Sequence, residues 1–151
     1  MLPTPRTSPR PRLDADQRRL LQRWDRIGLG VRLAYHPAST QGIRAFLHAG
    51  RCLVAAGVRS ELEVQVRTLG VLLDTARDPA LPLTWRRACV EHARLPLARL
   101  VTIGRRTGRV DAAMWLGRLE AIDRQLDETA ACDGRSDGTG PQARHRRDRS
   151  D

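Results

Sequence analysis

The sequence contains no lysine and no asparagine, so all 27 of its basic residues are arginine. The joint loss of both residue types indicates GC-rich coding, which favours arginine whatever the function. The formal charge of +10 is also spread along the chain, whereas a dedicated nucleic-acid binder concentrates its charge and adds aromatic residues for stacking. Nucleic acid therefore stays open as a partner but is not favoured.

Aromatic residues are scarce, at 3% of the chain. The core must therefore be built from Leu, Val and Ala, a composition that favours helices. No apolar run approaches the roughly 20 residues that a membrane span requires. The start of the chain, MLPTPRTSPRPR, is basic and proline-rich with no apolar segment behind it, which is not typical of a secretory signal. We expect a cytoplasmic protein that makes no membrane contact.

The chain has three cysteines, Cys52, Cys89 and Cys132, and no CxxC pair. Without a secretion signal they are expected to be reduced thiols. A zinc ribbon or thioredoxin-type site is not expected. No glycine-rich oxyanion loop or phosphate cradle accompanies them, so we expect no enzymatic activity and no obligatory cofactor.

Composition divides the chain into three parts. Residues 1–13 form a basic, proline-rich tail, and residues 131–151 form a second tail rich in Arg, Asp and Gly. Neither tail has enough apolar residues to offset the entropy of ordering, so both are expected to be disordered. The folded domain is expected over residues 14–130.

Hydrophobic residues in this domain recur at helical spacing. A first helix is expected to follow Asp14 or Asp16 as its N-cap and to end near His36, where the following proline stops it. A second helix is expected to close at Gly57 in the left-handed conformation. The expected core positions of these two helices are Leu20, Trp24, Ile27, Val31, Ile43, Phe46, Leu47, Gly50 and Val54.

The letters SELE at residues 60–63 predict a capping box between Ser60 and Glu63. The helix that follows is apolar on two sides, so we expect it to lie centrally with partners on both faces. Its two apolar sides comprise Leu62, Val66, Leu69, Leu73 and Ala76 on one and Val64 and Val71 on the other.

A fourth helix is expected from about Thr84, with a kink or break at Pro96. The letters GRRTG at residues 104–108 predict a basic turn, and a last helix is expected from Thr107. The expected inward positions are Trp85, Cys89, His92, Leu100, Trp115, Leu119, Ile122 and Leu126. The fold class is therefore all-α, a compact bundle of five to six helices with disordered termini.

The stretch LLDTARDPALPLTWRRACVEH, residues 72–92, joins two of these helices. Asp78 and Pro79 predict a turn, Pro82 precedes the next helix start, and Trp85 is expected to fill the core. The simplest interpretation of these four residues is a structural corner.

Residues 71–100 resemble FagA, a family of small proteobacterial proteins, and the piece WDRIGLGVRLAYHP resembles the Trp-containing first helix of that family. The resemblance implies a gene beside fumarase and manganese superoxide dismutase genes under iron-starvation control, and it implies no known reaction. The matching residues are Leu72, Leu73, Asp74, Asp78, Pro79, Leu81, Pro82, Trp85, Arg86, Cys89, His92, Pro96 and Leu97.

The iron link suggests a metal site as one alternative. Cys89 and His92 are three residues apart on a helix, and with Asp74 and Asp78 they could hold iron or zinc. A second pair, His48 and Cys52, is expected on the outer face of its helix and so away from the first. The favoured interpretation is that Cys89 is a buried hydrophobe and His92 a core histidine bonded to a helix carbonyl or carboxylate.

Arg105, Arg106 and Arg109 lie around the expected start of the last helix, where an anion or nucleic-acid phosphate could bind. A solvated turn is the preferred interpretation. Taken together, the sequence predicts a non-catalytic accessory protein of the iron-limitation or oxidative-stress response that acts through an unknown protein partner.

Overall fold

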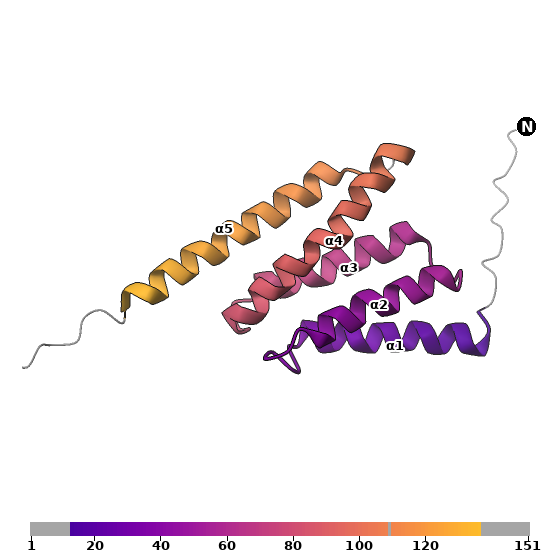
Figure 1. Ribbon diagram of the computed structural model, residues 1–151, viewed down its shortest axis with the longest axis horizontal. Coiled ribbons are helices and arrows are strands. Elements are labelled where there is room, and N and C mark those ends of the chain that lie inside the picture. Colours follow the sequence, from indigo (N-terminus) through magenta and orange to yellow (C-terminus); the bar gives the residue numbers. More distant parts are fainter. Residues whose placement is uncertain (1–12, 109, 137–151) are drawn as a thin grey trace, which may run out of the picture.

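The computed structural model describes residues 13–108 and 110–136, which form five α-helices and no strand (Figure 1). The helices are α1 (Ala15–Arg32), α2 (Gln41–Ala55), α3 (Glu61–Arg77), α4 (Leu83–Thr107) and α5 (Ala112–Ser136). The predicted all-α fold is confirmed. α5 continues past residue 130, so the helical part is longer than the sequence predicted. The expected disorder of residues 1–12 and 137–151 lies outside the described residues.

α3 is the central helix of the bundle, as its two apolar sides predicted. It contacts each of the other four helices, while α1 pairs with α2 and α4 pairs with α5. Figure 1 shows α1 and α2 on one side of α3 and α5 on the other. The burial of seven α3 residues follows from this position, and they are Val64, Thr68, Leu69, Leu72, Leu73, Thr75 and Ala76.

α1 and α2 approach closely through an aromatic pair. The rings of Trp24 and Phe46 stack with centroids 5.5 Å apart, and both side chains are buried. A Cβ atom at Gly28 would lie only 2.8 Å from Cε2 of Phe46, closer than real contacts allow. Gly28 weakens the helix locally, but its missing side chain makes room for the Phe46 ring.

Two predicted helix starts and one predicted helix end are confirmed by local hydrogen bonds. Asp14 and Ser60 each accept the backbone N–H three residues ahead, and each forms a complete capping box. Gly57 has a φ of +66° and follows α2, with the Val58 amide donating to the Leu53 carbonyl. That pattern is a Schellman motif, which favours glycine at this position.

The end of α1 was predicted too late. The helix ends at Arg32, and Ala34 adopts a φ of +49°. The Tyr35 amide donates to the Gly30 carbonyl and the Ala34 amide donates to that of Val31. This is again a Schellman motif, here with alanine where glycine is usual, so the sequence carried no signal for it.

Two further boundaries differ from the prediction. α4 runs as one helix from Leu83 to Thr107 with Pro96 buried inside it, so of the two outcomes expected at Pro96, a kink or a break, the break is wrong. Gly108, at a φ of +64°, then closes α4. α5 starts at Ala112 rather than Thr107, after Asp111, whose side chain accepts the Met114 amide.

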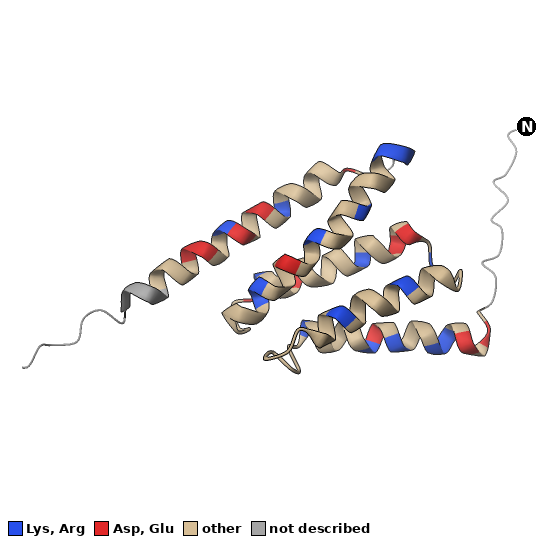
Figure 2. Cartoon of the chain, viewed as in Figure 1, with Lys and Arg blue, Asp and Glu red and all other residues tan. Residues whose placement is uncertain are grey.

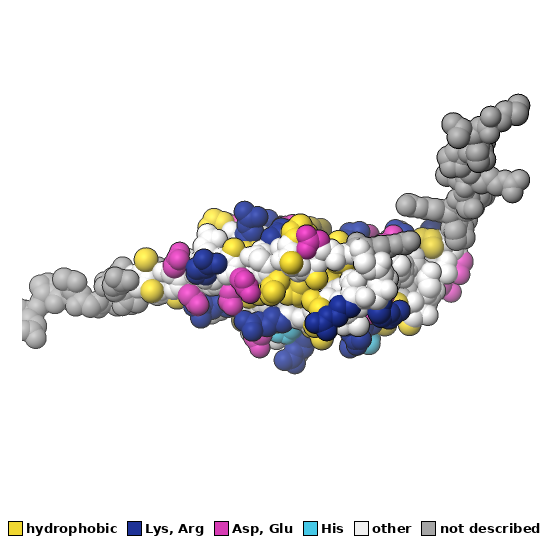
Figure 3. All heavy atoms as spheres, turned by 90° about the horizontal axis from the view of Figure 1, so that it is seen from above, with side chains coloured by type: hydrophobic (Ala, Val, Ile, Leu, Met, Phe, Trp, Pro, Cys, Tyr) yellow, Lys and Arg dark blue, Asp and Glu magenta, His cyan; other side chains and the backbone are white. Residues whose placement is uncertain are grey.

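Charged side chains of both signs are distributed over the bundle. Figure 2 shows arginines and acidic residues interspersed along α1 and α5, and Figure 3 shows both with hydrophobic side chains between them. α2 differs, because it carries arginines and no acidic residue. Within the described residues, no helix combines the length and apolar character that crossing a membrane requires.

Candidate functional site

The corner between α3 and α4 is held by Asp78. One carboxylate oxygen accepts a hydrogen bond from Arg32 at 2.8 Å, and the other accepts the Ala80 amide at 3.1 Å. The Arg32 hydrogen bond, followed by the Ala80 amide, lowers the pKa of Asp78 below its ordinary value of 3.8. Asp78 therefore joins the turn to the end of α1, a contact across 46 positions of sequence.

Trp85 also reaches α1 from the first turn of α4. Its indole N–H donates to the backbone carbonyl of Val31 at 3.1 Å, and the side chain is 2% exposed. The sequence predicted a core position for Trp85 but not this bond to α1.

Arg86 is a buried charged residue that the sequence analysis gave no role. Its Nε donates to the Ala76 carbonyl at 2.8 Å, and the residue is 5% exposed. Ala76 lies in the last turn of α3, where backbone carbonyls lack helical partners. Arg86 thus caps α3 from the next helix. Nothing in the sequence around Arg86 predicts this capping role, because Arg86 is one of several arginines in a basic, amphipathic helix.

Pro79 and Pro82 complete the corner. Asp78 has an extended backbone, as residues before proline do, and it ends α3. Pro82 stands at the N-cap of α4, and its carbonyl accepts the Arg86 amide at 3.0 Å. Asp78, Pro79, Pro82 and Trp85 thus form one compact connection, tied to the end of α1 at two points.

Cys89 and His92 occupy different environments within one turn of α4. Cys89 is fully buried, and that burial raises the pKa of its thiol to about 12. The thiol is protonated at neutral pH and therefore lacks the nucleophilic thiolate. The Nδ1 atom of His92 lies 2.9 Å from the carbonyl oxygen of Ala88. His92 is half-buried rather than in the core, and of the two partners expected for it, the helix carbonyl is the one observed.

Asp74 pairs with an arginine of α5. Its carboxylate lies 3.2 Å from the guanidinium of Arg118 in α5, and Arg118 also covers the Trp115 ring. The candidate ligands Asp74 and Asp78 therefore each pair with a different arginine. Among the described residues, no three His, Cys, Asp or Glu side chains are grouped so that they could hold a metal.

The second pair with chelating spacing lies on α2. Nε2 of His48 is 3.6 Å from Sγ of Cys52, and Nδ1 is 3.4 Å from Arg51. His48 is exposed, as the sequence predicted for this face. His48 and Cys52 together supply two donor atoms for a metal ion, and the positively charged Arg51 lies beside them.

The expected anion site around residue 107 is not at a helix start. Arg105 and Arg106 lie in the last turn of α4 and are exposed. Cationic side chains there stabilise the negative end of the helix dipole, whereas anions bind at the positive end. Arg109 lies outside the described residues.

Comparison with known proteins gives no relative on which to base a function. No family model matches the sequence, and neither a curated protein nor a solved structure shows significant similarity to it.

Proposed function

We propose that this chain is a non-catalytic accessory protein that binds a partner protein in the bacterial cytoplasm. The observation that carries the proposal is an exposed apolar patch at the end of α1, formed by Leu29, Leu33 and Tyr35. These side chains are 54%, 49% and 64% exposed. Exposed apolar patches on small soluble proteins are typical of interaction surfaces.

The three residues lie close together. Leu29 and Leu33 are one turn apart and therefore share a face of the helix. Tyr35 folds back along α1, with its Cδ2 atom 3.6 Å from the position that a Cβ on Gly30 would occupy. Arg32, between the two leucines, pairs with Asp78. The patch thus adjoins the corner between α3 and α4.

A non-catalytic role agrees with how the corner uses its chemical groups. Asp78 and Arg86 bond to the ends of α1 and α3, His92 bonds its own helix, and the Cys89 thiol is buried. These groups hold the bundle together and leave the exposed apolar patch as the surface for recognition. The iron-limitation setting of the proposal rests on the resemblance of residues 71–100 to FagA.

The proposal is tested with tagged chains expressed from the native locus, with and without an iron chelator. We expect chain abundance to rise on iron depletion and one partner to co-purify in stoichiometric amount. The double variant Leu29→Gln, Leu33→Gln in α1 should abolish that co-purification. The matched control is Met114→Gln with Leu116→Gln, which removes two exposed apolar side chains from α5.

Two outcomes would overturn parts of the proposal separately. Abundance that is unchanged by iron depletion would remove the iron-limitation role. A partner that is retained by the α1 variant and lost from the α5 variant would move the interaction surface to α5.

A further inference from the structure

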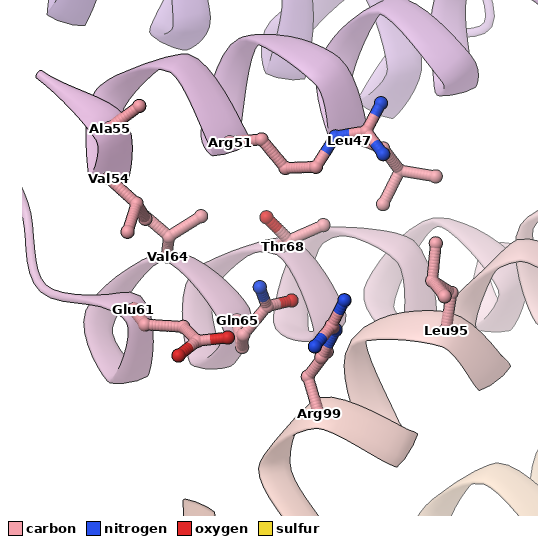
Figure 4. Close-up of a pocket in the computed structure, with 10 residues that line it drawn as sticks. All are labelled: Leu47, Arg51, Val54, Ala55, Glu61, Val64, Gln65, Thr68, Leu95 and Arg99. Atoms are coloured by element: carbon pink, nitrogen blue, oxygen red, sulfur yellow. The ribbon is translucent and has the colours of Figure 1, made fainter.

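A groove of about 300 Å³ lies between α2, α3 and α4, away from the corner (Figure 4). Its apolar lining is formed by Leu47 and Val54 of α2, Val64 of α3 and Leu95 of α4. Leu47 and Val54 are two of the α2 positions that the sequence assigned to the core, and both are only half-buried. The volume is at the low end of the range for small-molecule sites.

Two arginines line the same groove from different helices. Arg51 extends from α2 and Arg99 from α4, and Figure 4 shows them on opposite sides of the opening. Glu61 at the start of α3 is the acidic residue of the lining, so the formal charges leave one net positive charge. Arg99 makes no ion pair or hydrogen bond with the residues that the structure describes. This arrangement is complementary to a ligand with a single negative charge.

Thr68 of α3 forms part of the floor of the groove. The residue is 2% exposed, and its hydroxyl has no hydrogen-bond partner within the described part of the chain. Thr75, two turns further along α3, instead donates to the Val71 carbonyl at 2.6 Å. Figure 4 shows the Thr68 oxygen pointing from α3 towards α2. The oxygen itself has less than 1 Å² of accessible surface, so a ligand in the groove does not reach it.

We propose that this groove binds a small amphipathic carboxylate, an acid with a short hydrocarbon chain. The carboxylate lies between the guanidinium groups of Arg51 and Arg99. The hydrocarbon chain packs on Leu47 and Leu95. This site is separate from the apolar patch on α1, so it adds a ligand to the proposed function and does not depend on it.

The charge and shape of the lining distinguish a carboxylate from other anions. Planar guanidinium groups bind carboxylates through paired, charge-assisted hydrogen bonds. A phosphate dianion would be repelled by Glu61 and would leave the apolar lining uncovered. An alcohol or amine with the same hydrocarbon chain would lack the charge that the two arginines recognise.

The test is isothermal titration calorimetry of octanoate into the full-length chain at low salt. We expect saturable binding of one octanoate per chain. Arg51→Gln or Arg99→Gln should weaken binding by about tenfold, the typical effect of losing one charged hydrogen bond. Thr68→Val should leave the affinity unchanged, because the Thr68 hydroxyl is not exposed to the groove. Arg44→Gln is the matched control, because Arg44 is an exposed arginine of α2 that does not line the groove.

Octylamine and inorganic phosphate are the comparison ligands. Octylamine that binds as tightly as octanoate, or octanoate affinity that is equal in all four variants, would overturn the proposal. Phosphate that binds while octanoate does not would overturn the choice of a carboxylate. Arg99 is exposed and makes no ion pair, so Arg99→Gln is expected to keep the melting temperature of the parent chain, which identifies any loss of affinity as local.

Discussion

The indole N–H of Trp85 donates to the backbone carbonyl of Val31, 3.1 Å away and 54 positions earlier in the sequence. The same carbonyl accepts the Ala34 amide in the turn that closes α1. Nearby, Arg32 pairs with Asp78. The connection between α3 and α4 is thus attached to the end of α1 by one buried and one partly exposed contact. These two contacts fix how the α1–α2 pair packs against α3 and α4.

Replacing Trp85 should reveal how much this attachment stabilises the fold. We expect Trp85→Ala to lower the free energy of unfolding by about 3–5 kcal/mol, since it leaves a large cavity. Trp85→Phe keeps most of the side-chain volume but loses the hydrogen bond to Val31. The loss of that hydrogen bond should lower the free energy of unfolding by about 1 kcal/mol. Urea denaturation measures both. An unfolding free energy unchanged in Trp85→Ala would contradict the buried placement.

Ala34→Gly should stabilise the protein, which is unusual for a substitution to glycine. Ala34 has a φ of +49°, a conformation that disfavours a side chain by about 1–2 kcal/mol. Glycine also gives the unfolded chain more conformational entropy, which offsets part of this gain. The expected net increase in the free energy of unfolding is about 0.5–1 kcal/mol, measured by thermal or urea unfolding.

Gly57→Ala is the matched reverse substitution at the end of α2. Gly57 holds the same position of the same motif, and no atom lies within 4 Å of a Cβ added there. Its effect therefore reports the backbone conformation alone, and we expect a loss of about 1 kcal/mol. A loss of stability in both Ala34→Gly and Gly57→Ala would show that the α1 turn is not left-handed.

The Asp78–Arg32 pair should make stability depend on pH in the acid range. The pKa of Asp78 is lowered in the fold, so its contribution is fully present above the ordinary carboxyl pKa of 3.8. It is lost as pH falls from there through the lowered value, because protonation breaks the pair. The difference in unfolding free energy between the parent and Asp78→Asn should therefore be constant near neutral pH and shrink below about pH 4.

Arg32→Gln provides the control for this pH dependence. Removing the largest cause of the lowered pKa should raise the pKa of Asp78, which carboxyl NMR titration measures directly. An Asp78 pKa that is the same in Arg32→Gln and the parent would show that the Ala80 amide, and not the ion pair, controls the carboxylate.

The three cysteines should react with iodoacetamide in an order set by their environments. Cys132 is exposed, Cys52 is half-buried, and Cys89 is buried with a thiol pKa of about 12. Alkylation requires an accessible thiolate, so Cys89 should react only when the chain unfolds. Peptide mass spectrometry at pH 8 with and without urea gives the order. Labelling of Cys89 in the native protein as fast as Cys132 would contradict its position in the core.

Metal content distinguishes the partner-binding proposal from the metal-binding alternative. The protein is purified anaerobically, reduced and reloaded with ferrous iron or zinc. We expect it to retain much less than one metal ion per chain, because Asp74 and Asp78 are already paired with arginines. Elemental analysis is the measurement. Near-equimolar metal that disappears in His92→Ala would contradict this and assign the corner to metal binding.

Local signals in the sequence were sufficient for the elements that depend on neighbours along the chain. The Asp14 and Ser60 caps, the Gly57 turn and the apolar spacing of α3 were all predicted, since each is set within a few residues. The α5 start was predicted too early because residues 104–107, taken as a turn that opens the last helix, are the end of α4, and Asp111 caps α5 after it. The left-handed Ala34 had no signal, since alanine is not typical of that conformation.

The partners of the charged residues could not be predicted from the sequence. Arg86 caps α3, Asp78 pairs with Arg32 and Asp74 with Arg118, and each choice depends on which helix faces which. The same holds for the groove, whose lining comes from three helices. Spacing determined the helices, their caps and their buried faces, because those follow from local geometry. Only the packing of the helices decided which polar groups meet, because such contacts join residues far apart in the chain.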